Sequence, residues 1–139
     1  MPLSFVRFLS LLLFVLTTQS AQSATCTSLV SGNWSAAATW DCGGQPANGD
    51  SVVVGHALTL DTTTRRLAGL TVVAGASIVD NGSSWAIVLA GPLINNGTIT
   101  VSGGASGSFS LAGHSTWAGS GVVNARYIDM GSFYQLTLA

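Results

Sequence analysis

The stretch Asn33–Asp61, NWSAAATWDCGGQPANGDSVVVGHALTLD, decides the fold. Two short runs near its end, Ser51 to Gly55 and Ala57 to Asp61, have apolar residues at alternate positions. Alternation of this kind places one apolar side per β-strand, because successive side chains point to opposite faces of a sheet. The predicted inward residues are Val52, Val54, Leu58 and Leu60.

The first half of the stretch is predicted to cover the end of a β-structure. Trp34 and Trp40 flank a spacer of small residues, and each indole can cover a large apolar surface while its N–H stays available to a backbone carbonyl, as in a lid. Pro46 and the triplet Asn48-Gly49-Asp50 interrupt regular structure and favour a tight turn. A strand should therefore begin at Ser51.

Both apolar runs recur downstream with a nearly constant step. Short strands that recur between Gly and Asn turns are typical of stacked coils. The expected first series is Val52 and Val54, Leu70 and Val72, then Ile87 and Leu89; the second is Leu58, Ala76 and Leu93.

The stacked repeats predict an all-β fold, namely a right-handed parallel β-helix of short coils. Residues 24–50 would form an N-terminal cap, and residues 51–139 the coils, with a register after residue 101 that the sequence leaves open. A β-sandwich is the alternative, since sandwiches also have many short strands with regularly spaced turn signals.

Three motifs follow the two tryptophans in a fixed order and carry a family resemblance. They are P-x2-G-D-x-V-x-V from Pro46, G-x2-L-x-L-D from Gly55 and L-x2-L-x-V-x2-G from Leu67. Over roughly Trp34 to Val101 the chain resembles the glycine-rich G8-type domain. The resemblance implies a β-helical module of secreted or cell-surface proteins, which in some relatives accompanies polysaccharide-active regions. More weakly, the opening resembles the N-terminal region of large bacterial surface and pilus-associated proteins.

Residues 1–23 are predicted to be a secretory signal peptide. Arg7 precedes the apolar run Phe8 to Leu16, and Ala21-Gln22-Ser23 fits the small-x-small rule for cleavage before Ala24. An uncleaved membrane anchor is the alternative, although the run is shorter than the ~20 residues that a span needs. No span is expected after cleavage, so we expect a secreted, cell-surface or periplasmic protein.

Charge excludes two classes of partner. Beyond residue 23 the chain has five Asp and three Arg with no Lys or Glu, a net charge of −2. Nucleic acids and anionic membrane surfaces need a basic patch, so neither is an expected partner. The expected partners are an extracellular glycan or the rest of a larger surface assembly.

Cys26 and Cys42 are the chain's two cysteines, and in an exported protein they predict a structural disulfide. A loop of this length corresponds to ~3 kcal/mol of stabilisation. A metal or redox pair is the alternative, but the spacing is not C-x-x-C and neither histidine is close in sequence.

Asp50 and Asp61 bound the first coil and could serve as an acid and a base on a glycosidic bond if they met across a cleft. The favoured interpretation is structural: Asp50 would bond its own turn and Asp61 the Thr-rich corner after it. Asp80, in Asp80-Asn81-Gly82, has the same explanation.

Other polar residues give weaker indications. Arg65 and Arg66 either form a solvated turn or contact an acidic sugar through forked donors. His56 and His114 are isolated in sequence, so no metal site, cofactor or catalytic residue is predicted.

Three functions remain open. The favoured one is a non-catalytic structural or adhesive module of a secreted or cell-surface protein. A carbohydrate-binding or carbohydrate-active β-helix is the second, with aromatic platforms at Trp85, Trp117, Tyr127 and Tyr134. The third is a pilus-associated or surface assembly component, because the chain stops within the alternating run FYQLTLA and the last coil would be incomplete.

Overall fold

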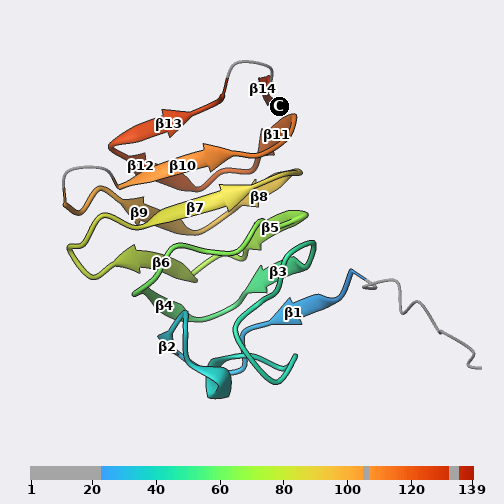
Figure 1. Ribbon diagram of the computed structural model, residues 1–139, viewed down its shortest axis with the longest axis vertical. Coiled ribbons are helices and arrows are strands. Elements are labelled where there is room, and N and C mark those ends of the chain that lie inside the picture. Colours follow the sequence, from blue (N-terminus) through green and yellow to red (C-terminus); the bar gives the residue numbers. More distant parts are fainter. Residues whose placement is uncertain (1–22, 105–106, 132–134) are drawn as a thin grey trace, which may run out of the picture.

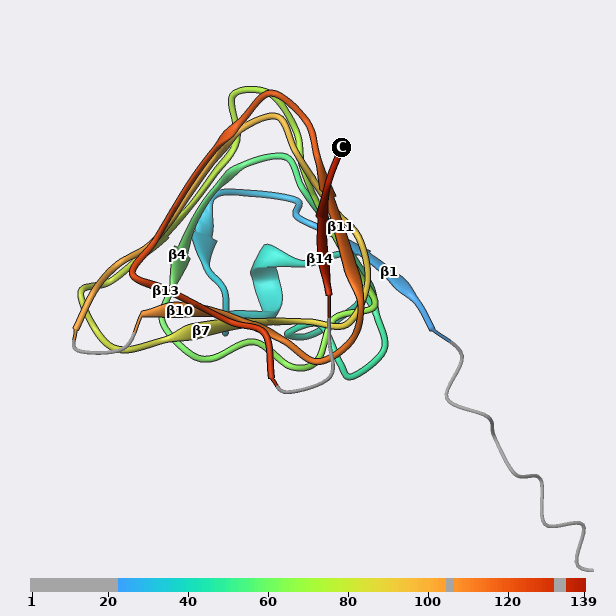
Figure 2. The same cartoon turned by 90° about the horizontal axis from the view of Figure 1, so that it is seen from above.

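The fold is a parallel β-helix. The computed structural model of the chain describes residues 23–104, 107–131 and 135–139, so nearly all of the predicted signal peptide lies outside the described residues. Strands pair in parallel between successive coils on three sides of a triangular cross-section (Figures 1 and 2). Parallel pairing throughout these sheets excludes the β-sandwich alternative, which is built from antiparallel sheets.

The chain visits the three sides in a fixed order. The first face is β1 (Thr25–Thr27), β3 (Ser51–Val54), β5 (Gly69–Val72), β8 (Leu93–Asn95), β11 (Ser115–Ala118) and β14 (Leu136–Leu138). The second face is β2 (Gly32–Asn33), β4 (Ala57–Leu60), β6 (Ser77–Asp80), β9 (Thr98–Val101) and β12 (Val122–Ala125). The third face is β7 (Ala86–Leu89), β10 (Ser108–Leu111) and β13 (Tyr127–Asp129). Seen from the end that holds β14, the rising chain turns anticlockwise, so the coil is right-handed (Figure 2).

We call the end that holds β1 and β2 the lower end, and the end that holds β12, β13 and β14 the upper end, as in Figure 1. A short 3-10 helix, η1 (Ala37–Thr39), lies at the lower end below β2. The segment predicted as a cap, residues 24–50, also supplies the first coil, because β1 pairs with β3 and β2 pairs with β4.

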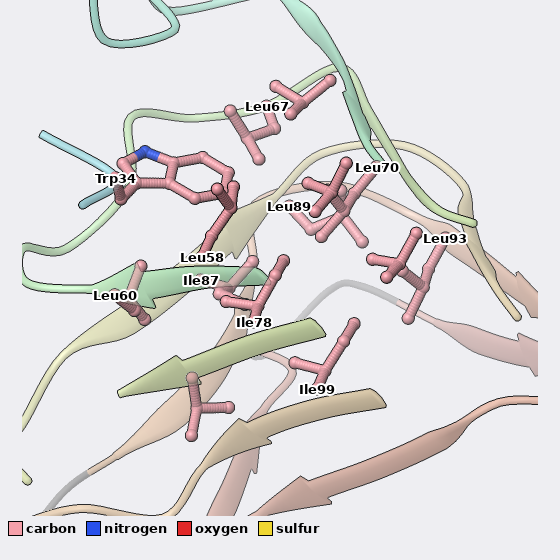
Figure 3. Close-up of a cluster of buried hydrophobic side chains, with 14 of the residues drawn as sticks. Trp34, Leu58, Leu60, Leu67, Leu70, Ile78, Ile87, Leu89, Leu93 and Ile99 are labelled. Carbon is pink, nitrogen blue, oxygen red and sulfur yellow. The ribbon is translucent and has the colours of Figure 1, made fainter. Parts of the chain in front are cut away.

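The core is a set of inward columns in which apolar residues stack from coil to coil. Burial of the alternating residues of the organising stretch is as predicted, with Val52, Val54, Leu58 and Leu60 at most 2% exposed. Figure 3 shows side chains from all three faces converging inside the coil, with the Trp34 indole beside Leu58 at the lower end. Burial of such side chains is the main stabilising contribution, at about 1.5–3 kcal/mol each.

The predicted register is correct for one step and wrong afterwards. Val52 pairs with Leu70, as expected. Leu70 then pairs with Leu93, which is a longer step along the chain, whereas Ile87 lies in β7 on the third face.

The second predicted series fails for the same reason. Leu58 pairs with Ile78 rather than with Ala76, and Leu93 belongs to the column of Val52 and Leu70. Each coil has three sides rather than two, and the corners between strands differ in length, so no constant step exists in the sequence. On the third side below β7 no strand is assigned among the described residues, yet the chain there pairs with β7 through a parallel bridge between Leu67 and Leu89 and a bond from the Thr64 N–H to the Ala86 carbonyl (3.0 Å).

Candidate functional site

The lower end is closed by chain that crosses beneath the first coil. The Leu29 N–H donates to the Thr39 carbonyl (2.8 Å), and the Asp41 N–H donates to the Thr27 carbonyl (3.0 Å). These bonds run along the edge of β1 that does not face β3, with an antiparallel bridge between Ser28 and Trp40. The outermost strand edge on the first face is therefore paired within the chain.

Two indoles fill the lower end. Trp34 is fully buried, and its ring meets the Trp40 ring edge-on with centroids 4.8 Å apart. The Trp40 Nε1–H donates to the Trp34 carbonyl at 2.8 Å, as the sequence predicted for a lid. The buried Trp34 Nε1, in contrast, has no hydrogen-bond partner among the described residues. That nitrogen lies within the coil, where apolar side chains surround the indole.

Cys26 and Cys42 lie at disulfide distance, with their Cα atoms 5.3 Å apart and their sulfurs joined. Cys26 is fully buried in the inward column of the first face. Cys42 is exposed and follows residues 39–41, the closing segment that bonds the lower edge of the first coil. The bridge therefore ties the chain that crosses the lower end to the core of the first coil.

Asp50 is 7% exposed and lies at the corner before β3. Its carboxylate accepts from the Ala47 N–H of its own turn (2.8 Å) and from the Ala24 N–H (3.1 Å). Gly49 before it has a φ of 85°, a conformation that glycine adopts without strain, as expected for the Asn-Gly turn. The carboxylate thus joins the turn to the strand that begins the preceding coil.

Asp61 lies after β4, in the second coil. It accepts from the Ser35 N–H (3.0 Å) and from the Ser35 hydroxyl (2.5 Å). The predicted bond to the Thr-rich corner is therefore corrected: the partner is one coil earlier, 26 residues back along the chain.

Asp80 also links two coils, one coil nearer the upper end than Asp61. Its carboxylate accepts from the Gly82 N–H of its own turn (2.8 Å) and from the N–H groups of Ser102 (2.7 Å) and Gly103 (2.8 Å) in the next coil. Asp50 thus acts at the corner before the first face, and Asp61 and Asp80 act at the corner after the second face in successive coils, each as a link between neighbouring coils.

The two adjacent arginines differ in their contacts. The Arg66 guanidinium donates through Nη2 to the Ala112 carbonyl at 2.7 Å, and Arg65 is exposed. Arg66 also lines a shallow depression of about 410 Å³ with Asn48, Gly49, Ala68 and Ala90. The contact of this pair with an acidic sugar stays a prediction.

Each histidine has a local structural contact. The Ser28 hydroxyl lies 3.0 Å from His56 Nδ1, and the same oxygen accepts from the Gly55 N–H at 2.9 Å. Because the hydroxyl accepts from Gly55, its own proton is available for His56. His114 Nδ1 accepts from the Gln135 N–H at 3.3 Å.

Only one of the four predicted aromatic platforms is largely exposed in the described residues. Trp117 is 8% exposed and packs on Phe109, while Trp85 is half-buried and its Nε1–H donates to Asn81 Oδ1. Tyr127 is 56% exposed on β13. Tyr134 lies outside the described residues.

Sequence reasoning missed Asn95, a polar residue inside the coil. It is 3% exposed; its amide donates to the Val122 carbonyl (3.0 Å), and its Oδ1 accepts from the Gly97 N–H (3.1 Å). The available signal was its position next but one after Leu93, where alternation predicts an inward side chain. Buried amides are retained where their hydrogen bonds are satisfied, as here.

The upper end has large apolar side chains that no described residue covers. Ile128 continues the inward column of Ile87 and Phe109, yet it is 45% exposed, and Met130 beyond it is 44% exposed. Leu138 lies above Trp117 and is 76% exposed. A depression of about 270 Å³ indents this end beside Trp117, Val123 and Leu138.

Within the described ranges, no group of three or more His, Cys, Asp or Glu side chains is placed to hold a metal ion. In the same ranges no helix is long and apolar enough to cross a membrane. No protein-family model, curated protein or solved structure matches this chain.

Proposed function

We propose that the chain is a non-catalytic structural or adhesive module of a secreted or cell-surface protein. The observation that carries the proposal is the use of the carboxylates. Each of these carboxylates, on Asp50, Asp61 and Asp80, accepts a backbone N–H from a neighbouring coil, as expected of groups that hold coils together. General acid or base chemistry instead needs a carboxyl group directed at a substrate.

Export is part of this proposal. It is supported by the signal-like residues 1–23 of the sequence and by the cysteine pair at disulfide distance, which is compatible with an extracellular location. The G8-type resemblance points to the same class of secreted module and remains a prediction.

The test compares turnover with stability. The protein exported to a bacterial periplasm is incubated with a panel of plant and bacterial polysaccharides, and reducing-sugar release is measured for the wild type, Asp50→Asn and Asp61→Asn. We expect no release above the blank for any of the three, while both variants unfold at lower urea concentration. Release by the wild type that disappears in either variant would overturn the proposal.

Carbohydrate binding is a second candidate, favoured by the exposed ring of Tyr127. Aromatic faces stack on sugar rings, but Trp117 is buried and Trp85 is half-buried, so these residues do not form a continuous exposed platform. Glycan-array binding that is lost in Tyr127→Ala, with Trp85→Phe as the matched control, would raise this candidate above the first.

A further inference from the structure

The second face presents two regular columns of outward side chains. Each of the strands β4, β6, β9 and β12 sends two alternate residues outward, and the parallel register stacks these residues from coil to coil. The face forms one side of the triangular cross-section (Figure 2). One column is Ala57, Ser77, Thr98 and Val122, and the other is Thr59, Val79, Thr100 and Asn124.

Every side chain in these two columns is short and uncharged. Each carries a methyl group, a hydroxyl group or both, with an amide only at Asn124. Asp80, the one charged residue within these four described strands, follows the outward Val79 and bonds the backbone at the corner. In the described ranges the hydroxyls of Thr59, Thr98 and Thr100 have no protein partner, so they are available to water.

These groups form a rectangular grid with two constant spacings. Neighbouring strands lie about 4.8 Å apart, and alternate residues along one strand lie about 6.6 Å apart. Oxygen atoms on the prism faces of hexagonal ice recur on a rectangular grid of similar spacings. Hydroxyl groups on such a grid hold water by hydrogen bonds, and methyl groups between them restrict the orientations of neighbouring water molecules. We propose that the second face of the β-helix binds ice.

Other occupants fit this face less well. Stacking on a polysaccharide needs aromatic rings, and the two outward columns contain none. Protein interfaces are centred on large anchors such as Trp, Tyr or Arg, and these described positions hold no such residue. A flat grid of small groups instead matches a flat, repeating surface of water molecules.

The first face provides a comparison within the same molecule. Its outward positions are also uncharged, but Gly69 follows Ser51 in one column and leaves a gap in the grid. The other column includes Val53, Thr71 and the larger side chain of Ile94. We therefore assign ice binding to the second face alone.

Ice binding rests on the proposed adhesive function, for which it names the substrate. Ice affinity and polysaccharide turnover are measured separately, so a protein without affinity for ice can still be a structural module. Release of sugar by the wild type would in turn leave the ice measurement unchanged.

Incorporation into slowly growing ice tests the proposal. The oxidised protein, recovered after export to a bacterial periplasm, is partitioned between growing ice and the remaining liquid, with an inert protein of similar size as the reference. We expect the wild type to enter the ice and the reference to be excluded. Thr100→Lys should lower the apparent ice affinity at least about tenfold, because a long charged side chain at the centre of the grid holds neighbouring groups off the ice.

Thr71→Lys is the matched control. Thr71 is also an outward, half-buried threonine in a parallel strand, but it lies on the first face. The apparent ice affinity should therefore change by less than about twofold. Urea unfolding checks that each variant is folded, and Thr98→Lys in the neighbouring column replaces Thr100→Lys if that variant fails to fold, because Thr98 is exposed.

Three outcomes would overturn the proposal. One is exclusion of the wild type from the ice to the same extent as the reference protein. Another is an equal effect of Thr100→Lys and Thr71→Lys, which would place any ice contact elsewhere on the molecule. The third is binding of the wild type to crystalline cellulose without incorporation into ice, which would assign the face to a polysaccharide.

Discussion

The two ends of this β-helix differ in how their inward columns and strand edges are covered. At the lower end the chain crosses beneath its own first strand, pairs with the free edge and buries Trp34 completely. At the upper end, Ile128 and Leu138 are the last described residues of two inward columns, and both are exposed. The strand edges there are unpaired among the described residues. At the lower end, the cover is a segment that leaves the repeat and returns across the first coil to bond its strand edge.

Removal of the Trp34 side chain should give the largest contrast between the ends. Trp34→Ala is expected to lower the free energy of unfolding by about 3–5 kcal/mol, because it leaves a large cavity in the first coil. Ile128→Ala should cost much less, since that side chain is already half in solvent. Urea unfolding followed by circular dichroism measures both.

Trp34→Phe sharpens that comparison. The lost Nε1–H has no partner among the described residues, so this variant should retain most of the stability that Trp34→Ala loses. A Trp34→Ala variant as stable as Ile128→Ala would contradict the view that the lower end is the tightly packed one.

Loss of the disulfide should come next. Cys26→Ala/Cys42→Ala is expected to destabilise the fold by ~3 kcal/mol, because the bridge closes a loop with a sequence separation of 16. Reductant should destabilise the wild type and leave the double variant unchanged in the same urea titration. Equal unfolding midpoints for oxidised and reduced wild type would show that the closing segment holds without its bridge.

The smallest expected effect concerns the carboxylates. Asp61→Asn should lower stability by about 1 kcal/mol, because the charged oxygens that bond Ser35 are replaced by a neutral amide. Asp129→Asn at the upper end is the matched control, since Asp129 bonds only the Gly131 N–H of its own turn among the described contacts. Thermal unfolding resolves the pair, and a larger shift for Asp129→Asn would reverse the comparison.

What could be predicted from the sequence depends on whether a contact is local. The strands that begin at Ser51 and Ala57 follow from alternation, and the bond from Asp50 to Ala47 lies within a single tight turn. The bond from Asp61 to Ser35 spans 26 residues, so it depends on coil length, which alternation does not encode.

The side chains exposed at the upper end could not be predicted from the sequence, because they depend on the register after residue 101, which alternation leaves open. That register is set by corners of unequal length, because the step from Leu70 to Leu93 is longer than the step from Val52 to Leu70 in the same column. An inward residue such as Ile128 can be recognised only once its column is known.

The variable corners have a practical consequence for anyone who wishes to label the protein. Successive coils have different numbers of residues between paired strand positions, yet the strands stay in register. The chain therefore adjusts the length of each coil at its corners. The exposed turn at Gly82, with a φ of 87°, is such a place. A short epitope inserted there would project from the edge of the triangle and leave the neighbouring columns in step.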